Sequence, residues 1–318
     1  MNVVQDQAAG LRRLIAVHPR CGFSDTATSV GRGAWVISVV SGVPESGKTT
    51  LATNLAVLLS QTGRHVMLID SNRGALSCHR LLGTEPRYSL ADLFADRRGL
   101  QEILSIGAVG IRVLPEGGRV LAFKRLSASR QRHLIERLST LEQVADVVII
   151  DTGNTESADT LAYALCSDTV LAIALPQQES LLRTYSLVKW LLLQRPDLHV
   201  GWVMNRYASL EQAKRVAKQV VRLLHQQFAD RVQWLGSLPE DPNVDAATEQ
   251  NACFWLCCPH SMAAKGLSTL AAELRIRMMT PSGASRRLYT FWEKLSEHLR
   301  PPALLPTPRE EDSTWLVA

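Results

Sequence analysis

Residues 42–49 read Gly42-Val43-Pro44-Glu45-Ser46-Gly47-Lys48-Thr49, and this stretch decides the fold expected for the chain of 318 residues. It fits the pattern GxxxxGK followed by Ser or Thr. It also follows an apolar run, Trp35–Val40, and precedes a helical pattern, Leu51–Ser60. Glycines let successive backbone N–H groups turn toward phosphate oxygens, and the N-terminus of the next helix adds its dipole. The sequence therefore predicts a phosphate-binding loop between a strand and a helix.

The polar residues of this loop have expected roles at a bound nucleotide. Lys48 would neutralise the β- and γ-phosphates, and the hydroxyl of Thr49 would coordinate Mg²⁺. The loop residues expected to bind the cofactor are Gly42, Glu45, Ser46, Gly47, Lys48, Thr49 and Thr50.

Two further apolar runs end in an acidic residue. Val66–Ile69 is followed by Asp70, and Val147–Ile150 is followed by Asp151. An apolar run that ends in Asp is, by itself, more often only the terminus of a strand. Beside a phosphate loop, however, a carboxylate at such a position holds Mg²⁺. We therefore expect a metal site formed by Thr49, Asp70 and Asp151.

Short apolar runs alternate with helical patterns from about residue 34 to residue 237. Because the runs are continuously apolar and rich in β-branched residues, they favour a parallel sheet covered on both faces. The predicted fold class is α/β, with a doubly wound, mainly parallel sheet and ligands at the carboxyl ends of its strands. The expected strands are Trp35–Val40, Val66–Ile69, Ile111–Leu114, Val147–Ile150, Val170–Leu175, Val200–Met204 and Val232–Leu235, and the main helical patterns are Leu51–Ser60, Arg130–Leu141, Leu181–Leu193 and Gln212–Phe228.

Four stretches carry a family resemblance beyond the phosphate loop. Residues 68–83 read LIDSNRGALSCHRLLG, and residues 151–153 read DTG. Residues 203–206 read VMNR, and residues 235–241 read LGSLPED. Together with the phosphate loop, these stretches resemble the MinD/ParA group of P-loop ATPases. The match includes that group's LIDADLGxxNxxxLLG segment without a gap.

The MinD/ParA resemblance implies a cofactor and a set of site residues. The cofactor would be ATP or ADP with Mg²⁺, and two copies of the chain would form a homodimer around it. The base contacts implied by the resemblance come from Asn205, Arg206 and Pro239. The catalytic positions that it implies are Lys48, Asp70 and Asn72.

The N-terminus narrows the resemblance further. Residues 6–14 read DQAAGLRRL, similar to the DQAxxLR motif of the FlhG family (also called FleN or YlxH), which regulates flagellar number. That resemblance covers about residues 5 to 300. It implies activation of an FlhF-type GTPase at the cell pole, with flagellar switch proteins or a transcriptional activator as further partners. The alternative is a disordered tail with a chance helical pattern. The partner-binding residues implied are Asp6, Gln7, Ala8, Leu11 and Arg12.

Four positions depart from the family pattern. The MinD/ParA loop normally carries a signature lysine where this chain has Val43, and two glycines where it has Pro44 and Glu45. Valine cannot attract an anion, and Pro44 removes one N–H from the loop. The second Asp of LIDADLG is here Asn72, whose amide cannot act as a general base at neutral pH. We expect nucleotide binding with weak or absent hydrolysis and a weakened dimer.

The C-terminal region has one helical pattern, residues 286–300, after a polar break. Its apolar residues recur at helical spacing among basic ones, which suits a helix lying in a membrane interface, as the family resemblance also implies. The alternative is a helix that packs on the protein's own sheet. The candidate membrane residues are Leu288, Phe291, Trp292, Leu295 and Leu299.

These patterns divide the chain into three parts. Residues 1–33 form the partner-activating segment and linker, 34–280 the nucleotide-binding domain, and 281–318 the amphipathic helix and tail. No stretch has the apolar length of a membrane span or the pattern of a secretory signal, so we expect a cytoplasmic protein, peripheral at the inner face of the plasma membrane at the cell pole. The segment Cys253–His260 lacks metal-ligand spacing and is interpreted as packing.

Two other function classes stay open. A degenerate scaffold could keep the fold and the N-terminal segment without using nucleotide, as Val43 and Asn72 suggest. A ParA-type DNA-partition ATPase would fit the net charge of +5. Direct DNA binding is nevertheless disfavoured, because the basic residues occur only in pairs such as Arg12-Arg13 and never as a cluster.

Overall fold

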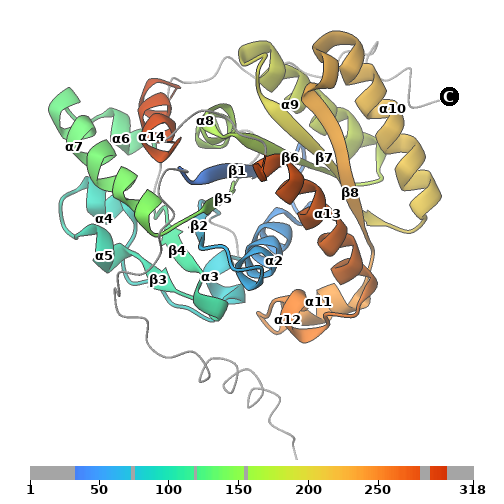
Figure 1. The fold of residues 1–318 in the computed structure, drawn as a ribbon, viewed down its shortest axis with the longest axis horizontal. Coiled ribbons are helices and arrows are strands. Elements are labelled where there is room, and N and C mark those ends of the chain that lie inside the picture. The colour runs from blue at the N-terminus through green and yellow to red at the C-terminus, as the bar shows by residue number, and fades with distance from the viewer. Residues whose placement is uncertain (1–32, 73–75, 118–119, 154–156, 280–286, 299–318) are drawn as a thin grey trace, which may run out of the picture.

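The strands form one eight-stranded sheet in the computed structural model, which describes residues 33–72, 76–117, 120–153, 157–279 and 287–298. The order across the sheet is β3-β4-β2-β5-β1-β6-β7-β8, and only the short pairing of β3 with β4 is antiparallel. Figure 1 shows the sheet running through the centre of the molecule. The strands are β1 Trp35–Val40, β2 Val66–Asp70, β3 Ser105–Ile106, β4 Arg112–Pro115, β5 Val147–Asp151, β6 Thr169–Ala174, β7 His199–Tyr207 and β8 Val232–Pro239.

Helices connect these strands and cover both faces of the sheet. The α-helices are α2 Lys48–Gln61, α3 Cys78–Leu81, α4 Leu90–Phe94, α5 Leu100–Ile103, α6 Leu121–Lys124, α7 Ala128–Ser139, α8 Ala158–Cys166, α9 Gln178–Gln194, α10 Leu210–Phe228, α11 Pro242–Glu249, α12 Phe254–Cys257, α13 Met262–Met279 and α14 Arg287–His298. Three short 3₁₀ turns are η1 Ala108–Gly110, η2 Thr140–Gln143 and η3 Ala229–Arg231.

The predicted fold class and all seven predicted strands are confirmed, each within a few residues of its expected bounds. Strands β1, β2, β5 and β6 are buried along their whole length, which is why they are continuously apolar rather than alternating. The sequence did not predict the two-residue strand β3 or the short helices between β2 and α7. Segments of four or five residues carry too little periodicity to be recognised.

The order of the strands places the phosphate loop at the centre of one sheet edge. Strand β1 lies between β5 and β6, and the loop connects β1 to α2. Strand β2 pairs with β5 in a register that sets Asp70 opposite Asp151. Because the strands are parallel, their carboxyl ends meet at this one edge, where ligands of such sheets bind.

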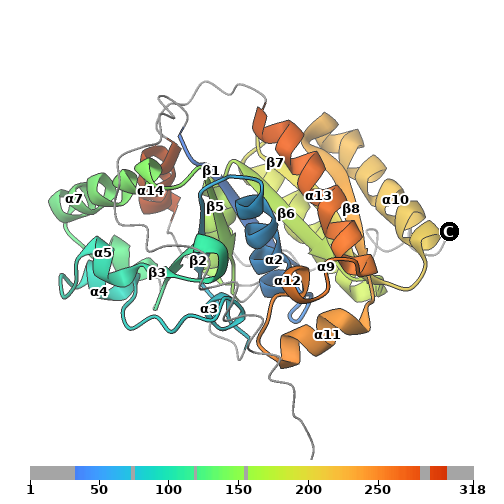
Figure 2. The ribbon, with the colours of Figure 1, turned by 60° about the horizontal axis from the view of Figure 1, so that its bottom comes forward.

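Alternate residues of each strand pack against opposite layers. Ile37 and Val39 of β1 join a core with α2, α12 and α13, whereas Val36 joins a core with α7, α8 and α14. Helices α9 and α10 cover the β6–β7 end of the face that α7, α8 and α14 occupy. Figures 1 and 2 show these two layers, with α2 and α13 together on one side.

Helix α14 belongs to the core of the domain. Leu288, Phe291, Trp292 and Leu295 are each at most 1% exposed, and the helix contacts α7, α8 and β1. The ring of Phe291 stacks on Tyr163 of α8 with centroids 6.3 Å apart. The structure thus corrects the expectation of a membrane-binding face for these four side chains, because the same face is used to cover the sheet. Leu299 lies outside the described residues.

Within the described ranges, no helix combines the length and the apolar character that a membrane span requires.

We predict that Trp292→Ala lowers the free energy of unfolding by about 3–5 kcal/mol, because it leaves a cavity under α14. Urea denaturation followed by circular dichroism measures the change. Glu293→Ala on the exposed side of the same helix is the matched control and should change it by less than about 0.5 kcal/mol. Equal stability of wild type and Trp292→Ala would show that α14 is not docked.

Candidate functional site

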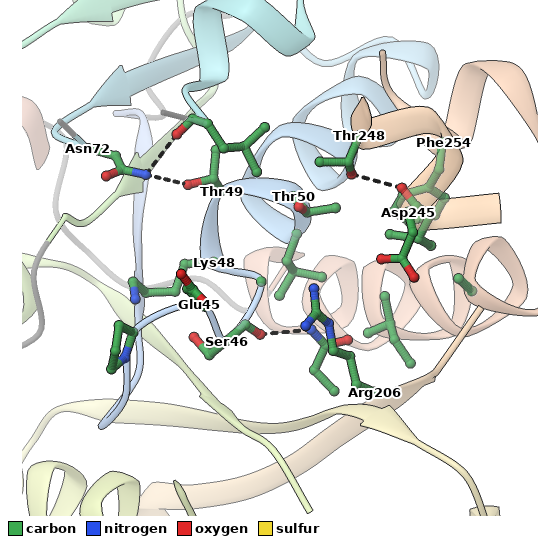
Figure 3. Close-up of a pocket in the computed structure, with 18 of the residues that line it drawn as sticks. Glu45, Ser46, Lys48, Thr49, Thr50, Asn72, Arg206, Asp245, Thr248 and Phe254 are labelled. Carbon is green, nitrogen blue, oxygen red and sulfur yellow. Dashed lines mark hydrogen bonds between the residues drawn. The ribbon is translucent and has the colours of Figure 1, made fainter. Parts of the chain in front are cut away.

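A cavity of about 1000 Å³ opens at the carboxyl edge of the sheet (Figure 3). Four parts of the chain surround it: the phosphate loop with the start of α2, the turns after β2, β4 and β5 with the start of α8, the ends of β7 and β8, and the helices α11 to α13. The lining residues include Pro44–Leu51, Ser71, Asn72, Glu116, Gly153, Asp159, Asn205, Arg206, Leu238–Asp241, Asp245, Thr248, Phe254 and Ala263.

The phosphate loop is shaped as the sequence predicts. Gly47 has a φ of +89°, and a Cβ at this residue would lie 2.4 Å from Nδ2 of Asn205. That same Nδ2 donates to the carbonyl oxygen of Ser46 at 2.8 Å, so the predicted base-binding residue also fixes the loop. A glycine is therefore required here by both backbone and space.

The beginning of α2 offers unsatisfied donors to the cavity. Its N-cap residue, Gly47, has no side chain to cap the helix, and the first residues, Lys48, Thr49 and Thr50, line the cavity. Beside them, the hydroxyl of Ser46 is buried without a hydrogen-bond partner in the described part of the chain. An uncapped helix end and an unpaired hydroxyl suit an anion with several acceptor oxygens, as a phosphate has.

Lys48 supplies the positive charge of the loop. Its side chain is only 9% exposed, and burial lowers its pKa, whereas the charge of Asp151 acts in the opposite direction. The ammonium group thus lies between a buried carboxylate and a cavity open to an anion. This is the position expected of a lysine that neutralises phosphate charge.

Thr49 joins the loop to the acidic strand ends. Its Oγ1 donates to Oδ2 of Asp151 at 2.7 Å. The same oxygen accepts from Nδ2 of Asn72 at 2.9 Å (Figure 3). Nδ2 of Asn72 also donates to the carbonyl oxygen of Leu76 at 3.0 Å. The amide at position 72 is therefore used to hold Thr49, and one of its N–H groups faces the oxygen that would ligate a metal.

Asp70 and Asp151 do not line the cavity. They lie at the paired ends of β2 and β5, behind Thr49 as seen from the cavity. Burial, and next the charge of Asp70, raise the pKa of Asp151 to about 7, although Thr49, Cys78 and Lys48 act to lower it. One oxygen of Asp151, Oδ1, is buried with no hydrogen-bond partner among the described residues. Two adjacent buried carboxylates with an unpaired oxygen fit a divalent cation, so the predicted trio of Thr49, Asp70 and Asp151 is brought together.

One loop residue is placed differently from the expectation. Gly42, predicted to bind the cofactor, does not line the cavity. Its N–H donates to Oγ1 of Thr184, and a Cβ would lie 2.3 Å from backbone atoms of Arg183 and Thr184, so this glycine permits close packing against α9. Glu45 does line the cavity, with an exposed side chain and a φ of +51°.

The wall of the cavity that α11 to α13 form was not predicted from the sequence. Asp241 is buried and accepts from the N–H groups of Asn243 and Ala263, which ties α11 to α13. Although burial acts to raise the pKa of Asp241, these donors together hold it below its ordinary value. The pair Asp241-Pro242 is a helix start signal that the sequence offered. Nothing in it indicated that Asp245, Thr248 and Phe254 would face the cavity.

The sequence analysis also did not predict two further acidic residues of the cavity, Glu116 and Asp159. Glu116 follows β4 and Asp159 lies in the first turn of α8, and both are buried at the cavity. Glu116 accepts from the hydroxyl of Ser71 and from the N–H of Val120. An apolar run before Glu116 was the available signal, the same one that identified Asp70 and Asp151. The residues of the N-terminal motif, Asp6, Gln7, Ala8, Leu11 and Arg12, lie outside the described residues.

The segment Cys253–His260, interpreted as packing, is only partly buried. Cys253 and Phe254 are buried, but Cys257 and His260 are exposed. No metal-ligand cluster is found there among the described residues.

Comparison with known proteins gives one matching family. The sequence model of the CobQ/CobB/MinD/ParA nucleotide binding domain matches residues 37–253, about two thirds of the chain. An antiactivator, FleN of Pseudomonas aeruginosa, is 25% identical over 263 residues, which are 83% of this chain and 94% of that protein. The flagellum site-determining protein YlxH of Helicobacter pylori is 20% identical and covers 83% of this chain and 90% of its own length.

A solved structure confirms the fold. The septum site-determining protein MinD of Pyrococcus horikoshii, complexed with Mg-ADP, superposes with a TM-score of 0.60 at 22% identity. The match covers 79% of this chain and all of that one.

Proposed function

We propose that this chain, which belongs to the CobQ/CobB/MinD/ParA nucleotide-binding family, is an ATP- and ADP-binding regulator of flagellar number and placement. The observation that carries the nucleotide part is the uncapped phosphate loop beside Lys48, Thr49 and Asp151. The flagellar part is supported by the similarity to FleN and YlxH over most of the chain.

The cavity accommodates the parts of a nucleotide along its length. The phosphates would lie against residues 46–50, where the donors of α2 and the ammonium of Lys48 are found. Thr49 and Asp151 would hold Mg²⁺, with Asp70 adjacent, and that ion would neutralise phosphate charge. The base would lie toward Asn205, Arg206 and Pro239, at the ends of β7 and β8.

Hydrolysis is expected to be slow. Val43 replaces the signature lysine that the family resemblance implies, and it does not line the cavity. Asn72 cannot remove a proton from water, and its amide is held by Thr49 and Leu76. Losing one well-placed charged contact to the transferring phosphate slows a reaction by about two to three decades. The chain is therefore proposed to act by binding nucleotide rather than by turning it over rapidly.

Two turns at the cavity are placed to respond to the nucleotide. A Cβ on Gly153 would lie 2.7 Å from the carbonyl oxygen of Ser71, so the turns after β2 and β5 are in contact. The N–H of Ser71 also donates to the carbonyl oxygen of Asp151 at 3.1 Å. A γ-phosphate that repositions one turn would therefore shift the other, which is the kind of change that switches partner surfaces.

The partners follow from the sequence motif. Residues 6–14 would contact and activate an FlhF-type GTPase, and flagellar switch proteins or a transcriptional activator would be further partners. We propose a cytoplasmic protein that works at the cell pole, with a nucleotide-dependent homodimer weakened by Val43. Membrane contact through α14 is not part of the proposal, because its apolar side chains lie in the core.

One observation favours a second candidate, a scaffold that works without nucleotide. Asn72, Thr49 and Asp151 form a hydrogen-bonded chain that already joins the turn after β2 to α2 and β5. Such a chain could hold the partner-binding conformation permanently. The two candidates differ in whether loss of nucleotide binding changes the flagellar phenotype.

We predict that cells in which this chain is replaced by its Lys48→Ala variant show the same abnormal flagellar number as cells that lack the chain. Without the buried ammonium the phosphates are not held, and the switch is lost. Flagella per cell are counted by electron microscopy at matched protein levels. Lys218→Ala, an exposed lysine of α10 far from the cavity, is the control and should be normal. Normal flagellation with Lys48→Ala would instead support the scaffold.

Steady-state phosphate release from ATP tests the proposed loss of hydrolysis. We expect the purified wild-type chain to release phosphate at a rate within about twofold of the Lys48→Ala variant, since the groups that activate water and stabilise the transferring phosphate are absent. Rapid turnover by wild type that disappears in Lys48→Ala would contradict this expectation.

A further inference from the structure

The buried thiol of Cys78 has no role in the proposed binding of nucleotide. It lies at the first residue of α3, directly beside the carboxylates that end β2 and β5. One ligand atom from each of Asp70, Cys78 and Asp151 lies within 4.8 Å of the other two. All three residues are buried, with Cys78 and Asp151 fully so.

The spacing of these atoms suits a small tetrahedral ion. The Sγ atom of Cys78 lies 3.4 Å from Oδ2 of Asp151. Sulfur at about 2.3 Å and carboxylate oxygen at about 2.0 Å from one zinc ion, at a tetrahedral angle, are about 3.5 Å apart. The two side chains are therefore already separated by the distance that a shared ion needs.

The charge of the cluster also calls for a cation. Asp70 and Asp151 face each other in register at the ends of neighbouring strands, and Lys48 is the cation that acts on Asp151. Independently of these contacts, Oδ1 of Asp151 is buried and has no hydrogen-bond partner in the described part of the chain. A buried carboxylate oxygen without a donor can ligate a cation.

A neighbouring histidine orients one of the ligands. Nδ1 of His79 lies 3.1 Å from Oδ2 of Asp70, and Oδ1 of the same carboxylate accepts from the N–H of Asn72 at 3.2 Å, so the carboxylate is held in one orientation. Partners that fix ligating side chains in this way raise the affinity of metal sites.

We propose that Asp70, Cys78 and Asp151 bind a thiophilic divalent cation of the zinc type when the nucleotide is absent. The ion replaces the thiol proton, which leaves to solvent as the sulfur–metal bond forms. Mg²⁺ needs oxygen ligands in octahedral geometry and gains nothing from the thiol, whereas zinc-type ions gain strongly from it. Because Asp151 would also serve Mg²⁺-nucleotide, the two ligands exclude each other. This last point rests on the proposed function, but binding of the ion alone does not.

Titration of the nucleotide-free, full-length chain with Co²⁺ tests the proposal. Cobalt is the probe because a thiolate–cobalt bond gives a charge-transfer absorption band in the near ultraviolet. Cys257 and Cys258, which are not buried, and Cys21, which lies outside the described residues, are first changed to Ser in every protein. We expect one equivalent of Co²⁺ to produce the band and to release protons to the medium.

The matched pair of variants is Cys78→Ser and Cys166→Ser. Both remove a buried thiol, but Cys166 lies at the far end of α8. Cys78→Ser should lose the band and weaken Co²⁺ binding by at least about tenfold, whereas Cys166→Ser should keep both. Circular dichroism confirms folding, and Cys78→Ala repeats the test if the serine variant does not fold.

Lys48→Ala separates this proposal from the proposed function. Removing the ammonium should abolish nucleotide binding and yet strengthen Co²⁺ binding, because a competing cation beside Asp151 is lost. Absence of the band, or a band that survives Cys78→Ser, would overturn the ion site while leaving nucleotide binding untouched. Nucleotide binding that fails while the cobalt band is present would overturn only the proposed function.

Discussion

The structure depends on two carboxylates held side by side away from water. The parallel register of β2 and β5 sets Asp70 directly opposite Asp151, and the layers of helices bury both. Two like charges in this position are unfavourable unless cations balance them. The loop after β1 supplies one, the ammonium of Lys48, while an oxygen of Asp151 has no hydrogen-bond partner among the residues that the structure describes. The carboxyl edge of the sheet is thus built to attract a further cation, and an anionic ligand above it.

The phosphate loop contacts Asp151 from the side of the cavity. The uncapped start of α2 attracts an anion, and Thr49 connects it to Asp151 through one 2.7 Å hydrogen bond. The proposed loss of turnover rests on position 72, where an amide stands and is occupied by Thr49 and Leu76. A site that keeps its binding groups and loses its water-activating group suits a regulator that reports nucleotide state. The thiol of Cys78 adds a second means of controlling the same edge.

The sequence predicted the phosphate loop and the acidic ends of β2 and β5, but not the helices that line the rest of the cavity. Strands β1, β2 and β5 were recognised because buried parallel strands are continuously apolar, and a fixed eight-residue motif located the loop. Asn205 was expected at the base and also proves to hold the loop through Ser46. The wall formed by α11 to α13 could not be predicted, since which face of a short helix meets a ligand depends on packing across the sheet. For the same reason, α14 could not be assigned from its amphipathic pattern: a face that suits a membrane also suits a core.

Calorimetric titration of the purified full-length chain with Mg²⁺-ATP and with Mg²⁺-ADP tests the central claim most directly. If the carboxyl edge is a working nucleotide site, both ligands bind with dissociation constants in the micromolar range, and Lys48→Ala removes the signal. No heat of binding up to millimolar nucleotide would contradict the account. It would mean that Val43, Pro44 and Glu45 have closed the site and that the fold serves only as a scaffold.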